Sequence, residues 1–332
     1  MRILVCEYVT GGGLAGRELP RSLAREGDMM LSALVKDLAE IGGTEVVVTR
    51  DRRLPPSSVK VETHWIGPED DPWTCWRGLS KDADAFWPIA PESEGLLEDL
   101  SRLTVETGCR LIGCSLEAVR LAASKGATAK HLAAEGIPVL APWPPEALED
   151  LPKGWVVKPD AGAGCEETRV FRARDRLQAW LNQTRGRGGF IVQPYLAGEA
   201  ASLSLLCQDG AALLLACNRQ DIVERDGRLR YLGSTVGGLE TRRFFYQRLA
   251  ERVARAMPGL WGYVGVDLVD TPGGAVILEV NPRLTTSYVG LRRSLGVNPA
   301  ELVLALLERG LSEITPPLVR RPTEVSVELC HA

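Results

Sequence analysis

The chain has 332 residues, of which 45% are apolar and 25% are charged. These fractions are typical of globular proteins and exclude disordered and fibrous classes. At roughly 150 residues per domain, the length predicts about two domains or subdomains. The formal net charge of −4 argues against a general nucleic-acid-binding protein, although local basic sites stay open.

Lysine is scarce in this chain. Only 7 of the 39 basic residues are Lys, and none follows Lys158. An arginine-rich genome explains most of this imbalance. Because arginine replaces lysine on most protein surfaces, each remaining lysine is worth inspecting as a site residue.

Cysteine and histidine patterns exclude several kinds of site. The eight cysteines form no Cys-x-x-Cys pair, so reduced thiols are expected, and the three scattered histidines argue against zinc. No G-x-S-x-G motif occurs, which disfavours a serine hydrolase. No stretch reaches the roughly 18 apolar residues of a membrane span, and the apolar start is too short for a signal peptide. We therefore expect a cytoplasmic protein without a membrane partner.

The first part of the chain predicts a small α/β domain that ends near residue 115. Apolar, β-branched segments alternate with segments of helical spacing, an order typical of βαβ units in a parallel sheet. Gly11-Gly12-Gly13 follows the first strand as a turn and does not match the dinucleotide fingerprint G-x-G-x-x-G. The expected strands are residues 3–9, 44–49, 84–89 and 110–113, and the expected helices are residues 19–41 and 92–107.

The remainder of the chain predicts an α+β fold with hairpins. Asp-Gly pairs at 209–210 and 226–227 are strong signals for tight turns between antiparallel strands. The expected helices are residues 116–136, 177–183 and 243–256, and the expected strands are residues 155–159, 169–172, 190–195, 201–207, 211–217, 262–269 and 275–280.

The last two strands place acidic residues opposite each other. Residues 270–274 have turn chemistry, and a hairpin symmetric about residue 273 pairs Asp267 with Glu279. Strand alternation then puts Asn281 on the same face as Glu279 and Leu278 on the opposite face. A slip of one residue in register would undo this pairing.

Two facing carboxylates repel each other unless a cation lies between them. Carboxylate and amide oxygens are hard ligands suited to Mg²⁺, so Asp267, Glu279 and Asn281 form a candidate magnesium site. An exposed acidic strand face is the alternative. Arg283 follows closely and is placed to meet a phosphate or a carboxylate, unless it is a surface arginine.

Two lysines and a glycine-rich loop form a second candidate site. Lys158 ends an apolar strand and precedes a loop that contains Gly162 and Gly164. Backbone N–H groups of such loops approach phosphate oxygens closely, while a lysine neutralises their charge. The loop does not match G-x-x-x-x-G-K-[ST], and a strand end with a solvated lysine is the alternative. Lys125 lies near a helix break and, taken alone, is typical of a surface lysine.

Residues 193–199 end another apolar strand and then turn. The backbone of such a segment can offer donors and acceptors to a purine edge, and its acidic residue can reach a ribose. An ordinary loop between two subdomains is the alternative.

In this combination and order, the residues resemble the ATP-grasp superfamily from about residue 116 to residue 311. The resemblance implies an α/β N-terminal domain with a parallel sheet, followed by an α+β ATP-grasp fold of two subdomains that clamp the nucleotide. The corresponding division is 1–115 for the N-terminal domain, 116–192 for the small subdomain and 193–332 for the C-terminal subdomain with the metal site.

The resemblance also implies roles for the residues around the nucleotide. Lys125 and Lys158 contact the phosphates of ATP, with Gly162 and Gly164 in the adjoining loop. The adenine hinge is formed by Gln193, Tyr195 and Leu196, and the ribose is held by Glu199.

By the same resemblance, Asp267, Glu279 and Asn281 hold two magnesium ions, with Mn²⁺ as an alternative. A substrate carboxylate attacks the γ-phosphate of ATP to give an acyl phosphate, and an amine then displaces phosphate to form an amide. Arg283 is the candidate for stabilising the acyl phosphate or the tetrahedral intermediate. The partners are therefore a small-molecule carboxylate and an amine.

Within the superfamily, the start of the chain is similar to the tyramine–glutamate ligases of methanofuran-type cofactor biosynthesis. The similar segments are residues 6–13, 27–38 and 86–92. This similarity implies a γ-glutamyl amide between glutamate and the amine of tyramine or tyrosine. Ligases of the superfamily are often dimers, so a homodimer is one expectation. The competing hypotheses are another ATP-grasp reaction, such as D-amino-acid dipeptide ligation or phosphoryl transfer, and a nucleotide-binding protein without turnover.

Overall fold

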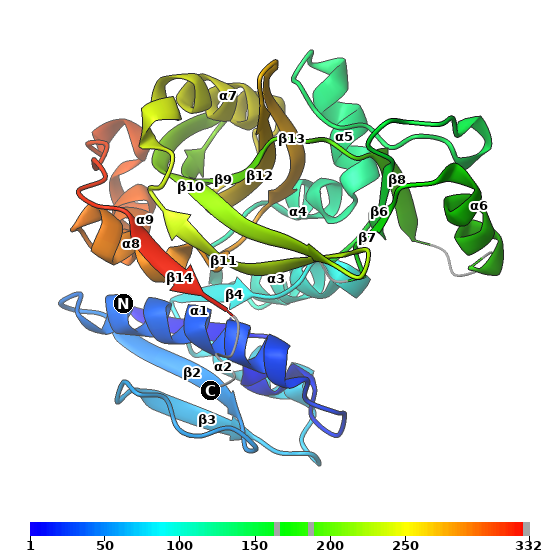
Figure 1. Ribbon diagram of the computed structural model, residues 1–332. Helices are drawn as coiled ribbons and strands as arrows, with labels where there is room; N and C mark the ends of the chain where they lie inside the picture. The colour runs from blue at the N-terminus through cyan, green and yellow to red at the C-terminus, as the bar shows by residue number, and fades with distance from the viewer. Residues whose placement is uncertain (163–166, 185–188, 328–332) are drawn as a thin grey trace.

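The computed structural model describes residues 1–162, 167–184 and 189–327, which form two β-sheets with helices packed around them (Figure 1). The N-terminal sheet lies in the lower half of Figure 1, and the larger second sheet lies above it. The first sheet is parallel and the second is antiparallel. The predicted succession of an α/β unit and an α+β unit is therefore confirmed. The proposed boundaries at residues 115 and 192 stay predictions.

The N-terminal sheet has the strand order β3-β2-β1-β4-β5. Its central strands are almost entirely buried, because helices cover both faces of a parallel sheet. Sequence patterns missed β3, whose polar side chains are only partly buried at the sheet edge. The strands are β1 (Arg2–Glu7), β2 (Glu45–Asp51), β3 (Glu62–Ile66), β4 (Ala85–Ile89) and β5 (Arg110–Leu111).

Three helices accompany this sheet. The second of them was also missed, although Asp71-Pro72 is a recognisable start signal: the Asp71 carboxylate accepts hydrogen bonds from the N–H groups of Trp73 and Thr74. The helices are α1 (Arg21–Ala39), α2 (Pro72–Lys81) and α3 (Leu96–Glu106).

The second sheet runs in the order β13-β12-β9-β10-β11-β7-β6-β8, with β14 pairing β11. Both predicted Asp-Gly turns are confirmed, since they join β9 to β10 and β10 to β11. The end formed by β6, β7 and β8 has its own small core around Trp155 and projects to the right in Figure 1. The strands are β6 (Trp155–Pro159), β7 (Arg169–Phe171), β8 (Phe190–Pro194), β9 (Glu199–Gln208), β10 (Ala211–Arg225), β11 (Arg228–Val236), β12 (Gly262–Thr271), β13 (Gly274–Asn281) and β14 (Thr323–Ser326).

The predicted single helix over residues 116–136 is two helices. Ser124 is extended, and its hydroxyl accepts a hydrogen bond from the N–H of Ala127, so it ends one helix and caps the next. Across the described residues, no helix combines the length and apolar character needed to cross a membrane. The helices after β5 are α4 (Leu116–Ala123), α5 (Lys125–Ala134), α6 (Arg174–Gln183), α7 (Arg243–Ala256), α8 (Tyr288–Leu295) and α9 (Pro299–Arg309).

The register of the β12–β13 hairpin agrees with the prediction at its functional end: Asp267 pairs with Glu279. The turn itself is one residue tighter than expected, because Thr271 pairs with Gly274. An irregularity between Asp267 and Leu268 restores the register by placing an extra residue, Leu278, in β13. The prediction that Leu278 faces away from Glu279 is wrong, since both line the same cavity. The bulge interrupts strict alternation at this point.

Packing explains the glycines after β1. Residues 9–13 form a tight π-helical turn at the carboxyl end of the sheet. Gly12 has a φ of +96°, and a Cβ added there would lie 2.6 Å from the Cβ of Ile66. The backbone of this turn therefore approaches β3 more closely than any side chain allows.

Replacing Gly12 with alanine is expected to lower the free energy of unfolding by about 2–4 kcal/mol, from backbone strain plus overpacking. Gly43→Ala is the matched control, because Gly43 also has a positive φ (+77°) but nothing lies within 4 Å of its added Cβ. That variant should lose only about 1–2 kcal/mol. Denaturant unfolding measures both losses, and equal losses would contradict the packing explanation.

Candidate active site

One cavity of about 360 Å³ collects most of the predicted site residues. Its walls come from the β12–β13 hairpin, from β6 and β8, and from the start of α5. The predicted residues that line it are Lys125, Lys158, Gly162, Gln193, Tyr195, Leu196, Asp267, Glu279, Asn281 and Arg283.

Among the described residues, one predicted site residue is not part of this lining. Glu199 is exposed at the start of β9, opposite Asp270, while the preceding Gly198 lines the cavity. Glu199 therefore lies outside the cavity lining, and its role as a ribose ligand stays a prediction. Gly164 lies outside the described residues.

Lys125 enters the cavity from the first turn of α5. The Ser124 cap fixes this turn, and the chain that follows α5 runs beside β13, with the N–H of Leu140 donating to the carbonyl of Ile277. The Lys125 residue is only 8% exposed. Its Nζ lies 2.9 Å from Oε2 of Glu279 and donates to the carbonyl of Gly162 at 2.7 Å. Lys125, which is typical of a surface lysine by sequence alone, is thus a buried cation in the structure.

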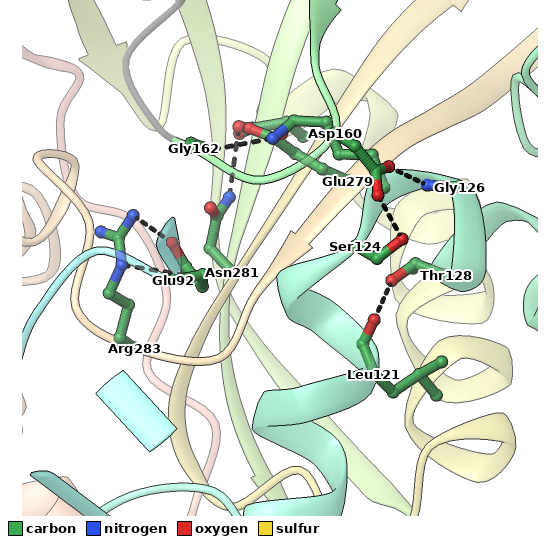
Figure 2. Close-up of polar contacts among 12 residues, drawn as sticks. Glu92, Leu121, Ser124, Gly126, Thr128, Asp160, Gly162, Glu279, Asn281 and Arg283 are labelled. Atoms are coloured by element: carbon green, nitrogen blue, oxygen red, sulfur yellow. Dashed lines mark hydrogen bonds and ion pairs between the residues drawn. The ribbon is translucent and has the colours of Figure 1, made fainter. Parts of the chain in front are cut away.

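Asp160 ties the glycine loop to the start of α5, as Figure 2 shows. Its Oδ2 accepts from the hydroxyl of Ser124 at 2.6 Å, and its Oδ1 accepts from the N–H of Gly126 at 2.7 Å. Sequence patterns did not assign Asp160 a function. An aspartate aligned with the N–H groups of a helix start is favourable, and it fixes Lys125 relative to the loop.

Asp267 and Glu279 face each other across the hairpin. Amides from two strands hold Asp267, since Nε2 of Gln220 donates to its Oδ1 at 2.9 Å and Nδ2 of Asn281 donates to its Oδ2 at 3.2 Å. Burial raises the pKa of Asp267 well above its ordinary value, and the negative charge of Glu279 adds to this rise. Sequence patterns alone do not place Gln220 beside Asp267, because the position of β10 in the sheet is needed for that.

The pKa of Glu279 shifts in the opposite direction. Burial acts to raise the pKa of its carboxyl, but Lys125 and Lys158 outweigh that effect and hold the pKa below its ordinary value. The pair thus combines one carboxylate stabilised by cations with one destabilised by its neighbour. Such divergent pKa values are common at functional sites.

The donor atoms of this cluster fit a magnesium ion. Asp267, Glu279 and Asn281 supply hard oxygen ligands, and the unfavourable proximity of the two carboxylates is what a divalent cation relieves. The described part of the chain contains no group of three or more His, Cys, Asp or Glu residues that could hold a metal. Mg²⁺ sites usually take one or two carboxylates and fill the remaining positions with phosphate oxygens and water.

The segment around β8 supplies a largely apolar slot at one end of the cavity. The buried Gln193 side chain donates through Nε2 to the carbonyl of Leu140 at 2.6 Å. The Tyr195 ring stacks on the guanidinium of Arg172, with 4.3 Å between the guanidinium carbon and the ring centre. The apolar residues that line the same cavity are Leu140, Val156, Leu196, Ile222, Leu229, Val269 and Leu278.

Arg283 lies at the end of the cavity nearest the N-terminal unit. Its Nε and Nη2 each lie 2.9 Å from an oxygen of Glu92, which follows β4, and its Nη1 donates to the carbonyl of Leu284 at 3.0 Å. Figure 2 shows this pair beside Asn281. The alternative of a surface arginine is therefore wrong, because the Arg283 side chain is only 9% exposed.

Comparison with known proteins identifies the chain as an ATP-dependent ligase. Residues 122–287 match the model of the ATP-grasp domain, and residues 44–119 match the model of the pre ATP-grasp 3 domain. The chain belongs to the ATP-grasp family. Enzymes of this family use ATP together with Mg²⁺.

Relatives cover nearly the whole chain. The tyramine–L-glutamate ligase of Methanocaldococcus jannaschii is 28% identical over 308 residues, which are 91% of this chain and 88% of the relative. The enzyme of the same name from Methanocaldococcus fervens is 26% identical over 294 residues, 87% of this chain and 89% of the relative. A solved structure from Archaeoglobus fulgidus, described as an ATP-grasp superfamily protein, has a TM-score of 0.70 at 23% identity, covering 92% of this chain and 88% of that one.

The facing carboxylates predict an unusual stability effect. Asp267→Asn removes the charge repulsion at nearly constant shape, and the neighbouring amides of Gln220 and Asn281 can turn to offer an oxygen instead. Without nucleotide or metal, this variant should have a higher free energy of unfolding than the wild type at neutral pH, because burial and the charge of Glu279 disfavour the charged form of Asp267. Because the folded wild type binds the proton more tightly than the unfolded chain, its own stability should rise as pH falls toward the ordinary Asp value.

Asp51→Asn is the matched control. Asp51 is also buried, but the hydrogen bonds that it accepts from Arg53, together with the charge of Arg53, outweigh burial and lower the pKa of Asp51. The same substitution there should decrease the free energy of unfolding by about 1–3 kcal/mol. Denaturant unfolding between pH 5 and 8 gives both values, and a destabilised Asp267→Asn variant would contradict the repulsion.

Proposed function

We propose that this protein is an ATP- and magnesium-dependent carboxylate–amine ligase that joins the γ-carboxyl group of glutamate to the amine of tyramine or tyrosine. The observation that carries the chemistry is the single cavity in which Lys125, Lys158 and Arg283 meet the facing pair Asp267 and Glu279. The substrate assignment is supported by the two relatives, whose names specify tyramine and glutamate and whose similarity spans most of each chain.

In this proposal the nucleotide lies along the cavity. Lys125 and Lys158 neutralise the phosphates, an assignment supported by their positions on the wall that also carries Gly162. The adenine occupies the apolar slot against Tyr195 and Leu196, where backbone groups of the turn after β8 offer hydrogen bonds. The proposal leaves Glu199 without a role in binding ribose.

Asp267, Glu279 and Asn281 would hold Mg²⁺, with two ions as in the family-based expectation. The bound metal supplies charge neutralisation and polarises the phosphate oxygens. Lys125, which pairs with Glu279, is then within reach of both the metal ligands and the phosphates. An ammonium group suits this task, since a lysine carries a compact point charge.

The reaction follows from these parts. An oxygen of the glutamate γ-carboxylate attacks the γ-phosphorus of ATP, ADP leaves, and an acyl phosphate forms. The nitrogen of the amine then attacks the acyl carbon, phosphate leaves, and the amine gives up a proton as the amide forms. Arg283 orients N–H donors toward the oxygens that carry the developing negative charge. No covalent enzyme intermediate is required.

The proposal is tested by phosphate and ADP release from ATP over a panel of acids and amines, with mass spectrometry of the products. We expect ADP and a γ-glutamyl amide with glutamate plus tyramine or tyrosine. Turnover only with other pairs, such as two D-amino acids, would overturn the substrate assignment. Nucleotide binding without turnover over the whole panel would overturn the enzymatic proposal.

Glu279→Gln should lower magnesium-dependent turnover roughly 100-fold or more, a larger loss than the 10–100-fold typical of outer-shell metal residues. The amide keeps the shape and one oxygen for Lys125, so thermal unfolding should stay close to wild type. Asp270→Asn is the control on the same hairpin, because Asp270 is bound by Arg242 and Tyr246 and is not part of the cavity lining. The Asp270→Asn control should retain most of the wild-type turnover. Near-normal turnover by Glu279→Gln would contradict the metal assignment.

A further inference from the structure

The pair of Glu92 and Arg283 joins two distant parts of the chain at the cavity. The residues are 191 positions apart, and their side chains are 5% and 9% exposed. Nη2 of Arg283 donates a hydrogen bond to Oε2 of Glu92 at 2.9 Å, and Nε lies 2.9 Å from Oε1 as an ion-pair contact without hydrogen-bond geometry. The hydrogen bond and the second close contact together orient the guanidinium group, and the carboxylate compensates its charge.

The position of Glu92 in the N-terminal sheet is informative. In the strand order β3-β2-β1-β4-β5, chain connections leave in opposite directions from β1 and β4. Open α/β sheets bind ligands outside the carboxyl ends of the strands at such a switch point. Glu92 follows the carboxyl end of β4, and Glu7 forms the carboxyl end of β1. The N-terminal sheet thus presents its usual ligand-binding edge to Arg283.

Glu7 adds a second fixed group at this edge. Its Oε2 accepts from the N–H and the hydroxyl of Thr10, both at 2.7 Å, and burial raises the pKa of its carboxyl. Arg283 interacts electrostatically with Glu7, and also with Glu26 of α1, which lines the cavity. Arg283 is therefore set within an acidic wall that belongs to the N-terminal unit.

Stability alone does not explain this pair. Removing two charges from water costs several kcal/mol per ion, so a buried ion pair is often no more stabilising than apolar residues of similar size. What the pair does provide is a fixed geometry, because Glu92 and the carbonyl of Leu284 together engage three nitrogens of Arg283.

We propose that Glu92 is a positioning residue, which holds the guanidinium of Arg283 in the orientation needed to stabilise acyl phosphate formation and its attack by the amine. The N-terminal unit thereby completes the active site of the ATP-grasp unit. This inference rests on the proposed function, in which Arg283 serves the acyl transfer.

Glu92→Gln is the first test. It keeps the shape but loses one acceptor and the charge, so Arg283 is no longer held by both contacts. A displacement of about 1 Å can reduce rates roughly 100-fold, and we expect kcat to fall about 10- to 100-fold while KM for ATP changes little. An effect on KM for ATP with unchanged kcat would overturn the proposal.

A double-mutant cycle separates positioning from general damage. If Glu92 acts through Arg283, then Glu92→Gln combined with Arg283→Met should be no slower than Arg283→Met alone. Multiplying losses would overturn the proposal. Where Glu92→Gln is unfolded at the assay temperature, Glu92→Asp replaces it in the same cycle, because it keeps the charge and withdraws the carboxylate by one methylene.

Asp37→Asn is the matched control for docking of the two units. Asp37 of α1 is likewise a buried carboxylate bound to the C-terminal part, through Nη1 of Arg292 and the hydroxyl of Tyr288, both at 3.0 Å. This variant should keep its kcat, whether or not its thermal stability changes. An equal loss of kcat in Asp37→Asn and Glu92→Gln would mean that Glu92 only docks the units, and would overturn the proposal.

The cycle is run with whichever acid and amine the wild-type enzyme turns over. Failure with glutamate and tyramine but success with another pair would overturn the substrate assignment and leave this test intact. Absence of turnover with every pair would overturn both.

Discussion

Two carboxylates held opposite each other in a buried cavity are the constraint on which the rest of the site depends. In such surroundings Asp267 and Glu279 repel each other strongly, and nearby opposite charge must compensate. Lys125 provides part of it by a direct ion pair with Glu279, and Lys158 contributes from the same cavity wall. The raised pKa of Asp267 shows that, with protein groups alone, compensation is incomplete. A further cation would therefore be favourable in this cluster, and enzymes of the ATP-grasp family use Mg²⁺.

This constraint explains several local features around the β12–β13 hairpin. The extra residue in β13 lets Glu279 face Asp267 although the turn is one residue tighter than symmetry about residue 273 requires. The Ser124 cap and Asp160 place Lys125 on the glycine loop and toward Glu279. Each device orients one charged group relative to the others. In the free protein the two carboxylates lie close together, and their repulsion is unfavourable. Binding of a cation would relieve that repulsion.

The sequence predicted the elements that are strongly patterned and the site residues that follow them. The buried strands of both sheets and the pairing of Asp267 with Glu279 could be found because apolar runs and turn residues determine them locally. The edge strand β3 and the bulge at Leu278 could not, since partial burial and irregular pairing leave no periodic signal. Gln220, Asp160 and Glu92 act through contacts with segments 34 to 191 residues away, which only the folded chain brings together.

The contrast between lysine and arginine in this chain has a physical basis at the active site. Both lysines of the cavity precede β7, whereas no lysine follows Lys158, so the cation contributed by the C-terminal part is Arg283. A lysine there could not make both close contacts with Glu92, because an ammonium has no planar fork. Since Glu92 neutralises Arg283, the guanidinium offers oriented donors and little net charge. Under the proposed function, the lysines and the metal would supply the charge that the triphosphate needs, while Arg283 would orient the groups in acyl transfer. Glu92 would then give the N-terminal sheet a part in setting that orientation.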